Sequence, residues 1–191
     1  MRAGFTGSQR YCTITWAGDQ FVDWSLDDGL ASVIPAALSL GLSGYGLHHF
    51  DVGGYTSLFG IGRSEELLLR YAEFAAFTPM MRTHEGNRPS ANWQYYSSER
   101  TMHAFARHTQ IFHLLSNYTR ALVKENNELG IPTQRPLFMH YEEDSNSYTI
   151  QYQYMYGEDL LVAPVYSEGK NTWEVYLPGT QKVFTEPIIW G

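Results

Sequence analysis

The chain contains 191 residues, of which 43% are hydrophobic, 15% aromatic and 17% charged, a composition typical of a folded globular segment. Its formal net charge of −7 at pH 7, with no cluster of Lys and Arg, argues against nucleic acid as a partner. The single cysteine, Cys12, cannot form an intramolecular disulfide and favours a reducing compartment.

No targeting or membrane-spanning pattern is visible in the sequence. The first residues lack the basic, hydrophobic and small-residue order of a signal peptide, and no apolar run approaches the roughly 20 residues of a membrane span. We therefore expect a cytoplasmic protein without a membrane partner. A chain that begins so close to a strand can also be cut from a longer protein, in which case an upstream signal would be invisible.

The first predicted strand ends at a carboxylate. Residues 13–16, Thr-Ile-Thr-Trp, are β-branched and aromatic, and Gly18 removes a side chain just before Asp19. A carboxyl group beside an indole is partly desolvated, which favours its neutral form and suits a proton donor near neutral pH. The alternative interpretation is that Asp19 caps a turn or pairs with an arginine.

Apolar residues recur at helical spacing in three segments. The predicted helices cover residues 28–42, a segment that begins at Ser64, and residues 98–127. Asp27 or Asp28 can accept amide hydrogen bonds in the first turn of the first helix. Gly130 follows the predicted helix over residues 98–127, and glycine is common just after the end of a helix.

Further strands are predicted between these helices, at residues 45–50 and 80–82. Strands that alternate with helices are parallel, and the polar groups that follow them then lie at their carboxyl ends. Asp19, Asp51 with Tyr55, and His84 are therefore expected to converge on one rim. At 191 residues the chain is short of the roughly 250 typical of a complete β/α barrel, so the sequence predicts part of one.

The pattern changes in the last third of the chain. Tyrosines and Ile150 share one parity over residues 148–156, residues 160–164 read as a buried strand, and residues 173–178 as another. Strands without intervening helices indicate the start of a β-sandwich. We predict an α/β fold in which residues 1–136 form the C-terminal part of a barrel and residues 137–191 begin an incomplete β-sandwich domain. The composition of residues 182–191 is left without an interpretation.

Four motifs together carry a family resemblance. They are His-His-Phe-Asp-Val-Gly-Gly-Tyr-Thr at 48–56, Met-Met-Arg-Thr-His-Glu-Gly-Asn-Arg-Pro at 80–89, Arg-Pro-Leu-Phe at 135–138, and Gly-Glu-Asp-Leu-Leu-Val-Ala-Pro-Val at 157–165. In this order they resemble the second half of glycoside hydrolase family 31, the retaining α-glucosidase family. The first two are most similar to the sulfoquinovosidase branch of that family.

The resemblance implies roles for five residues. Asp19 matches the general acid/base, and Arg2, Trp16, Tyr55 and His84 match positions that line the sugar pocket. A retaining glycosidase needs a second carboxylate about 5–5.5 Å from the first, as nucleophile. The resemblance implies that the nucleophile lies upstream of Met1. Asp51 matches a family position that is not the nucleophile, and we expect the chain alone to be inactive.

The substrate implied by the resemblance is an α-sulfoquinovoside or an α-glucoside. Tyr55 offers a hydroxyl where many family members have Phe, which favours an anionic or highly polar substituent such as a sulfonate. The alternative is a tyrosine that only packs. The Arg and Trp that the branch uses for the sulfonate lie upstream and are absent from this chain.

No metal or other cofactor is predicted. His48 and His49 are adjacent on a strand and point to opposite faces, while His103, His108 and His113 wind around a helix. The expected partner is a small carbohydrate. Two other functions stay open: lyase chemistry, in which the covalent intermediate eliminates, and a noncatalytic sugar-binding fragment that self-associates through exposed strand edges.

Overall fold

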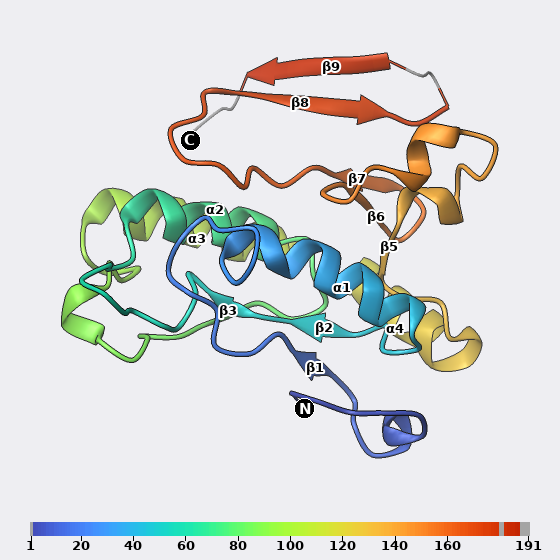
Figure 1. The fold of residues 1–191 in the computed structure, drawn as a ribbon, viewed down its shortest axis with the longest axis horizontal. Coiled ribbons are helices and arrows are strands. Elements are labelled where there is room, and N and C mark those ends of the chain that lie inside the picture. The colour runs from blue at the N-terminus through green and yellow to red at the C-terminus, as the bar shows by residue number, and fades with distance from the viewer. Residues whose placement is uncertain (1, 180–181, 188–191) are drawn as a thin grey trace.

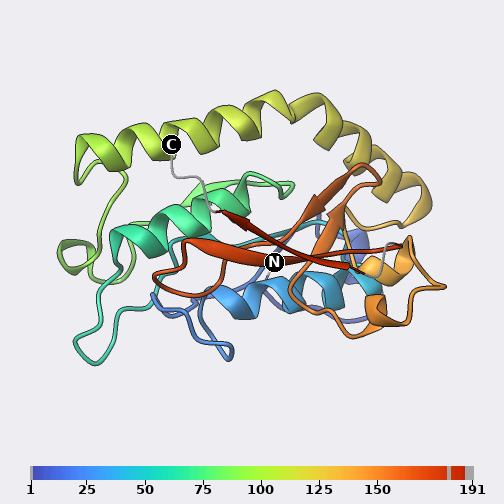
Figure 2. The same ribbon diagram turned by 90° about the horizontal axis from the view of Figure 1, so that it is seen from above.

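The computed structural model describes residues 2–179 and 182–187 of the chain, and their elements form three layers (Figure 1). Short strands from the first half of the chain form the lowest layer in this view, and helices cover one face of them. Strands from the last third of the chain lie beyond the helices and cross over them when the molecule is seen from above (Figure 2). The layers therefore follow the order of the sequence.

The helices are α1 (Val33–Leu42), α2 (Glu65–Ala75), α3 (Glu99–Leu114) and α4 (Ser116–Leu129). Short 3₁₀ turns lie at Ser8–Arg10, Leu30–Ser32, Pro89–Ala91, Leu137–Met139 and Ser145–Tyr148. The strands are β1 (Thr15–Trp16), β2 (His48–His49), β3 (Asp51–Val52), β4 (Arg82–Thr83), β5 (Gln134–Arg135), β6 (Tyr154–Tyr156), β7 (Leu160–Val162), β8 (Thr172–Leu177) and β9 (Lys182–Pro187). No helix in the described part of the chain is long and apolar enough to cross a membrane.

The first four strands are parallel, as the alternation of strands and helices predicted. β1 pairs with β2, and β3 pairs with β4 with Asp51 opposite Arg82. Only Phe50 separates β2 from β3, so one extended segment connects the pairings on either side. α1 connects β1 to β2 and α2 connects β3 to β4, which is the repeating unit of a β/α barrel. The α/β prediction is confirmed.

The hydrophobic core lies between the parallel strands and the helices. Phe50 is 2% exposed, stacks on Phe74 with ring centroids 4.6 Å apart, and contacts Tyr71 at 5.6 Å. Tyr154 and Tyr156 of β6 belong to the same core cluster. The last third of the chain therefore shares a core with the helices, and does not fold against itself alone.

Two helix predictions need correction. Neither Asp27 nor Asp28 caps the first helix, because Gly29 occupies the cap position of a 3₁₀ turn that leads into α1. The predicted helix over residues 98–127 is interrupted at Leu115, where ψ is 0°. α3 packs on α2, whereas α4 is held on β6. The Tyr118 hydroxyl donates to the Tyr156 carbonyl, and the Thr119 hydroxyl is hydrogen-bonded to the Tyr156 hydroxyl. The two halves of the predicted helix therefore pack on different elements.

The strand predicted from alternating tyrosines over residues 148–156 is shorter in the structure. Only Tyr154–Tyr156 of residues 148–156 is a strand, and Ser145–Tyr148 is a 3₁₀ turn. The Asp144 carboxylate accepts the amide hydrogen bond of Asn146 at 3.1 Å, and the Tyr148 ring stacks on Phe138 at 5.1 Å. These local contacts hold residues 145–148 in a turn, although the alternation of tyrosines predicted a strand.

β8 and β9 pair antiparallel over six residues each, so residues 182–187 form a strand that pairs with residues 172–177.

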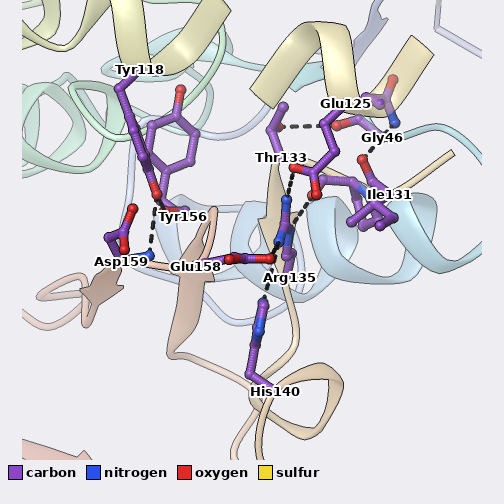
Figure 3. Close-up of polar contacts among 12 residues, drawn as sticks. Gly46, Tyr118, Glu125, Ile131, Thr133, Arg135, His140, Tyr156, Glu158 and Asp159 are labelled. Carbon is purple, nitrogen blue, oxygen red and sulfur yellow. Dashed lines mark hydrogen bonds and ion pairs between the residues drawn. The ribbon is translucent and has the colours of Figure 1, made fainter. Parts of the chain in front are cut away.

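A buried arginine joins α4 to the C-terminal strands (Figure 3). The Arg135 side chain is 2% exposed, donates to the Pro132 carbonyl at 2.9 Å and forms an ion pair with Glu125 of α4. A second carboxylate, Glu158, lies 3.8 Å from Arg135 but is 71% exposed. The buried guanidinium therefore depends mainly on Glu125 for its charge compensation.

We predict unequal stability losses from the two carboxylates. Glu125→Gln leaves a buried charge poorly compensated and should destabilise the protein by about 2 kcal/mol or more, whereas Glu158→Gln, which alters an exposed pair, should cost less than about 1 kcal/mol. Thermal unfolding of the two variants of the full-length protein measures the difference. Equal drops in Tm would contradict this account of Arg135.

Candidate active site

Eight residues in or beside the parallel strands line one open cavity of about 500 Å³. They are Trp16, Asp19, His49, Asp51, Tyr55, Met80, Arg82 and His84. Four of the five residues that the sequence pointed to are therefore brought together, and Arg2 lies beside them. Parallel strands place their carboxyl ends at one edge, which explains the convergence.

Asp19 sits on a sharp turn after β1. Gly18 has φ +102°, a backbone conformation that residues with a side chain rarely adopt. A Cβ atom at this position would lie 3.3 Å from the Arg2 Nε atom. The Thr56 hydroxyl donates to the Asp19 carbonyl at 2.7 Å, which fixes the backbone of the turn. The Asp19 side chain keeps 36% of its surface exposed. Its carboxylate is thus held at the cavity wall and still reaches water.

Arg2 contacts Asp19 from outside the cavity. Its Nη1 atom lies 3.5 Å from Asp19 Oδ2, and its guanidinium carbon lies 5.6 Å from the centre of the Trp16 ring. Arg2 is 62% exposed, so this ion pair is weak. The alternative interpretation of Asp19, pairing with an arginine, is therefore correct as a contact, and it leaves the carboxylate accessible.

The Trp16 indole does not donate to Asp19. Its Nε1 atom donates to Asp51 Oδ1 at 3.2 Å, and the same oxygen forms an ion pair with Arg82. Asp51 is fully buried, whereas Arg82 is 36% exposed at the cavity. Burial raises the pKa of Asp51, and the positive charge of Arg82 opposes that shift.

Tyr55 and His84 form a second wall. Their rings meet edge to face with centroids 4.9 Å apart. The Gly86 amide donates to His84 Nδ1 at 3.0 Å, so the neutral imidazole carries its proton on Nε2. His84 can therefore donate one hydrogen bond from Nε2 to a bound hydroxyl group.

The two adjacent histidines face opposite ways, as their strand position predicted. His49 lines the cavity, while His48 Nδ1 lies 3.1 Å from the Thr15 hydroxyl in the interior. Burial lowers the pKa of His48 to about 4, and burial with the charge of Arg82 lowers the pKa of His49. Both imidazoles are therefore neutral at pH 7.

Sequence reasoning missed Arg82, His49 and Met80 as cavity residues, whereas it expected Asp51 at this rim and assigned it no catalytic role. The parallel register places Asp51 opposite Arg82. An acid four residues before Tyr55 and a base two residues before His84 were therefore a usable signal. Two larger cavities, of about 610 and 780 Å³, lie elsewhere on the chain. Neither is lined by two carboxylates or by a histidine.

Comparison with known proteins identifies the fold. The TIM-barrel domain model of glycosyl hydrolases family 31 matches residues 1–118, and the C-terminal domain model of that family matches residues 130–187. The chain belongs to glycosyl hydrolase family 31. Part of a barrel followed by a C-terminal domain was predicted and is confirmed. The predicted boundary between residues 136 and 137 stays a prediction.

Sulfoquinovosidases are among the similar proteins. This family 31 chain is 61% identical over 178 residues to the sulfoquinovosidase of Escherichia coli K12 and 53% identical over 179 residues to that of Agrobacterium fabrum. The matches cover 93% and 94% of the chain but only 26% and 27% of those proteins. The chain thus spans about a quarter of its curated relatives.

Solved structures agree with the sequence matches. A family 31 sulfoquinovosidase from E. rectale, in complex with the aza-sugar inhibitor IFGSQ, superposes with a TM-score of 0.95 at 53% identity. That match covers 100% of this chain and 30% of the other. A family 31 α-xylosidase from a soil metagenome, complexed with xylose, gives a TM-score of 0.82 at 26% identity and covers 93% and 29%.

We predict a non-additive pair at Asp51 and Arg82 of the family 31 site. Arg82→Met leaves a fully buried carboxylate unpaired and should cost about 3–5 kcal/mol. Asp51→Asn frees a half-exposed guanidinium, which water can solvate, and should cost less. The double variant should be more stable than Arg82→Met alone. Thermal unfolding of the three variants measures the coupling, and additive losses would contradict the pairing.

The stability of the Arg82→Met variant should depend on pH differently from that of the wild type. Without Arg82 the folded-state pKa of Asp51 rises further above its unfolded value, so the folded protein holds the proton more tightly than the unfolded chain. The stability of Arg82→Met should therefore increase as pH falls through that raised pKa, relative to wild type. Thermal unfolding between pH 7 and about pH 5 measures this, and a difference that does not change with pH would count against it.

Proposed function

We propose that this chain is the acid/base segment of a retaining α-glycosidase that hydrolyses α-sulfoquinovosides. The observation that carries the proposal is the position of Asp19, a partly exposed carboxylate in the same cavity as Tyr55, His84 and Trp16. The identity to two sulfoquinovosidases, 61% and 53%, supports the choice of substrate. We prefer hydrolysis to lyase chemistry because both of these relatives are named as glycosidases.

In this proposal Asp19 acts twice. As an acid it protonates the glycosidic oxygen while the bond to the sugar breaks, and as a base it then takes a proton from the water that attacks the covalent intermediate. Both steps need a carboxyl group that gains and loses a proton in contact with water. The partial exposure of Asp19 and its long contact to Arg2 meet that requirement.

The nucleophile is a residue outside this chain. Among the cavity residues the other carboxylate is Asp51, and it is a poor candidate because it is fully buried and bonded to Trp16 and Arg82. A retaining mechanism needs the second carboxylate about 5–5.5 Å from the first. The chain alone is therefore proposed to be inactive, and tests of activity use the full-length protein.

Tyr55, His84 and Trp16 are proposed to hold the sugar. The Nε2–H of His84 can donate to a sugar hydroxyl, and the Tyr55 hydroxyl can donate to a sulfonate oxygen. Trp16 supplies an aromatic surface beside the cavity. Arg2, which lies beside Asp19 at 3.5 Å, is proposed to contact the bound sugar from the edge of the pocket.

A cytoplasmic location and self-association are proposals that need their own tests. Cys12 is half-buried and donates to the Ile14 carbonyl, which agrees with a reduced thiol. Cell fractionation that recovers the protein outside the cytoplasm would reject the cytoplasmic location.

Light scattering of the chain alone tests self-association, and a monomer at all concentrations would reject that proposal.

We predict a substrate-dependent loss in the full-length Asp19→Asn variant. Turnover of alkyl glycosides should nearly vanish, since a poor leaving group needs protonation. An activated aryl glycoside should still form the intermediate, and azide, which needs no base, should restore its turnover. The exposed Asp27→Asn is the matched control and should behave as wild type. Normal rates on alkyl glycosides would remove Asp19 from the acid/base role.

Tyr55→Phe is predicted to separate sulfonated from plain sugars. The variant keeps the ring and loses one hydroxyl, and a hydrogen bond to a charged group is worth roughly 1.5–3 kcal/mol, or about tenfold to a hundredfold in kcat/KM. That loss is expected for an aryl α-sulfoquinovoside and a smaller one for the aryl α-glucoside. Tyr148→Phe, at an exposed ring far from the cavity, is the control. Equal losses for both sugars would return the chain to a generic α-glucosidase.

A further inference from the structure

Arg63 lies behind the cavity and is 2% exposed. Its guanidinium donates to five neutral oxygens. These are the carbonyls of Val52 at 3.5 Å, Gly54 at 3.3 Å, His84 at 2.9 Å and Trp93 at 2.8 Å, and the side-chain oxygen of Gln94 at 2.9 Å. No carboxylate of the described residues lies within ion-pair distance of it.

Apart from Val52 of β3, the acceptors belong to two loops that carry cavity residues. Residues 53–63 follow β3 and contain Tyr55, and residues 84–97 follow β4 and begin with His84. Arg63 contacts the carbonyl of Gly54, directly before Tyr55, and the carbonyl of His84 itself. One side chain therefore fixes the backbone beneath both rings.

The geometry leaves little freedom for another arrangement. Gly53 has φ +96°, and a Cβ there would lie 2.5 Å from the Arg63 Cδ atom. The Asn92 side chain accepts from the Arg63 amide at 2.9 Å and from the Ser57 hydroxyl at 2.6 Å, which links the same two loops again. The Tyr55 carbonyl accepts from the Asn87 amide at 3.0 Å. Arg63 is the charged centre of this network.

Among the described residues no carboxylate forms an ion pair with Arg63, and the charge of Asp51 acts on it only from beyond ion-pair distance. Burial lowers the pKa of Arg63 to about 10, so it remains protonated at neutral pH. Around the cavity, Arg2 pairs with Asp19 and Arg82 pairs with Asp51, and Arg63 adds a positive charge to these two balanced pairs. A buried charge acts strongly on its surroundings because the protein interior screens it less than water does.

We propose that Arg63 is a positioning residue for Tyr55 and His84, and that its unpaired charge favours an anionic sugar over a neutral one. The inference deepens the proposed function and rests on it. A lysine at the same position keeps the charge, but its single ammonium cannot span five acceptors. A glutamine removes the charge and retains two donors.

Steady-state kinetics of full-length Arg63→Gln and Arg63→Lys test both parts. The substrates are an aryl α-sulfoquinovoside and the aryl α-glucoside with the same leaving group, at neutral and at alkaline pH. In Arg63→Gln the ratio of kcat/KM for the sulfonated over the neutral sugar should fall about tenfold. In Arg63→Lys that ratio should be kept, while kcat falls for both sugars because the loops are less well held.

Arg70→Gln is the matched control. Arg70 is also buried, at 1% exposure, but pairs with Glu73 and contacts the Lys170 carbonyl, away from the cavity. Its variant should lose thermal stability and keep the ratio between the sugars. Calorimetric titration of sulfoquinovose and glucose into the Asp19→Asn protein, with and without Arg63→Gln, measures sugar binding where turnover is weak.

The outcomes are distinct. A wild-type enzyme that does not prefer the sulfonated sugar rejects the proposed function. If wild type does prefer it, an unchanged ratio in Arg63→Gln overturns the role of the charge. A fall of kcat in Arg63→Lys no larger than in Arg70→Gln overturns the positioning role. If Arg63→Gln does not fold, the pH dependence of the ratio in Arg63→Lys decides the role of the charge, because a buried lysine loses its proton at alkaline pH more readily than arginine. The ratio should fall at alkaline pH in Arg63→Lys and not in wild type, and the same pH dependence in both proteins rejects the role of the charge.

Discussion

One buried carboxylate determines how three strands meet at the cavity. Asp51 is the first residue of β3 and binds both the Trp16 indole of β1 and the Arg82 guanidinium of β4. Trp16 lies three residues before Asp19, and Arg82 lies two before His84, so this contact sets where both side chains emerge. A neutral or displaced side chain at Asp51 would leave three strand ends without a common partner.

The two cavity aspartates have different environments and hence different chemistry. Asp51 is fully buried, and its Oδ1 atom is held by both Trp16 and Arg82. Asp19 is 36% exposed, contacts Arg2 only at 3.5 Å, and lies on a turn that Gly18 makes possible. A pair of carboxyl groups placed in contrasting surroundings is how one site separates a structural charge from a reactive one.

Much of this arrangement is predictable from the sequence, because it follows from period and chain order. Apolar spacing located α1, α2 and the α3–α4 region, and the rule for carboxyl ends of parallel strands brought Asp19, Tyr55 and His84 to one rim. The break at Leu115 and the short strand at residues 154–156 were not predictable, since they depend on which neighbour each segment packs against. Arg63 was missed because its five acceptors are mostly backbone carbonyls, and these have no sequence signature.

The distribution of the buried arginines separates stability from specificity. Arg135 contacts Glu125 and the loop before β5 (Figure 3), and Arg70 contacts Glu73 and the Lys170 carbonyl in the C-terminal part. Both are compensated by carboxylates, as expected for charges that serve packing. Arg63 alone among these three donates only to neutral oxygens, and these belong to the segments that carry Tyr55 and His84. The desolvation of its charge is therefore offset by hydrogen bonds that hold the cavity wall, and not by a carboxylate.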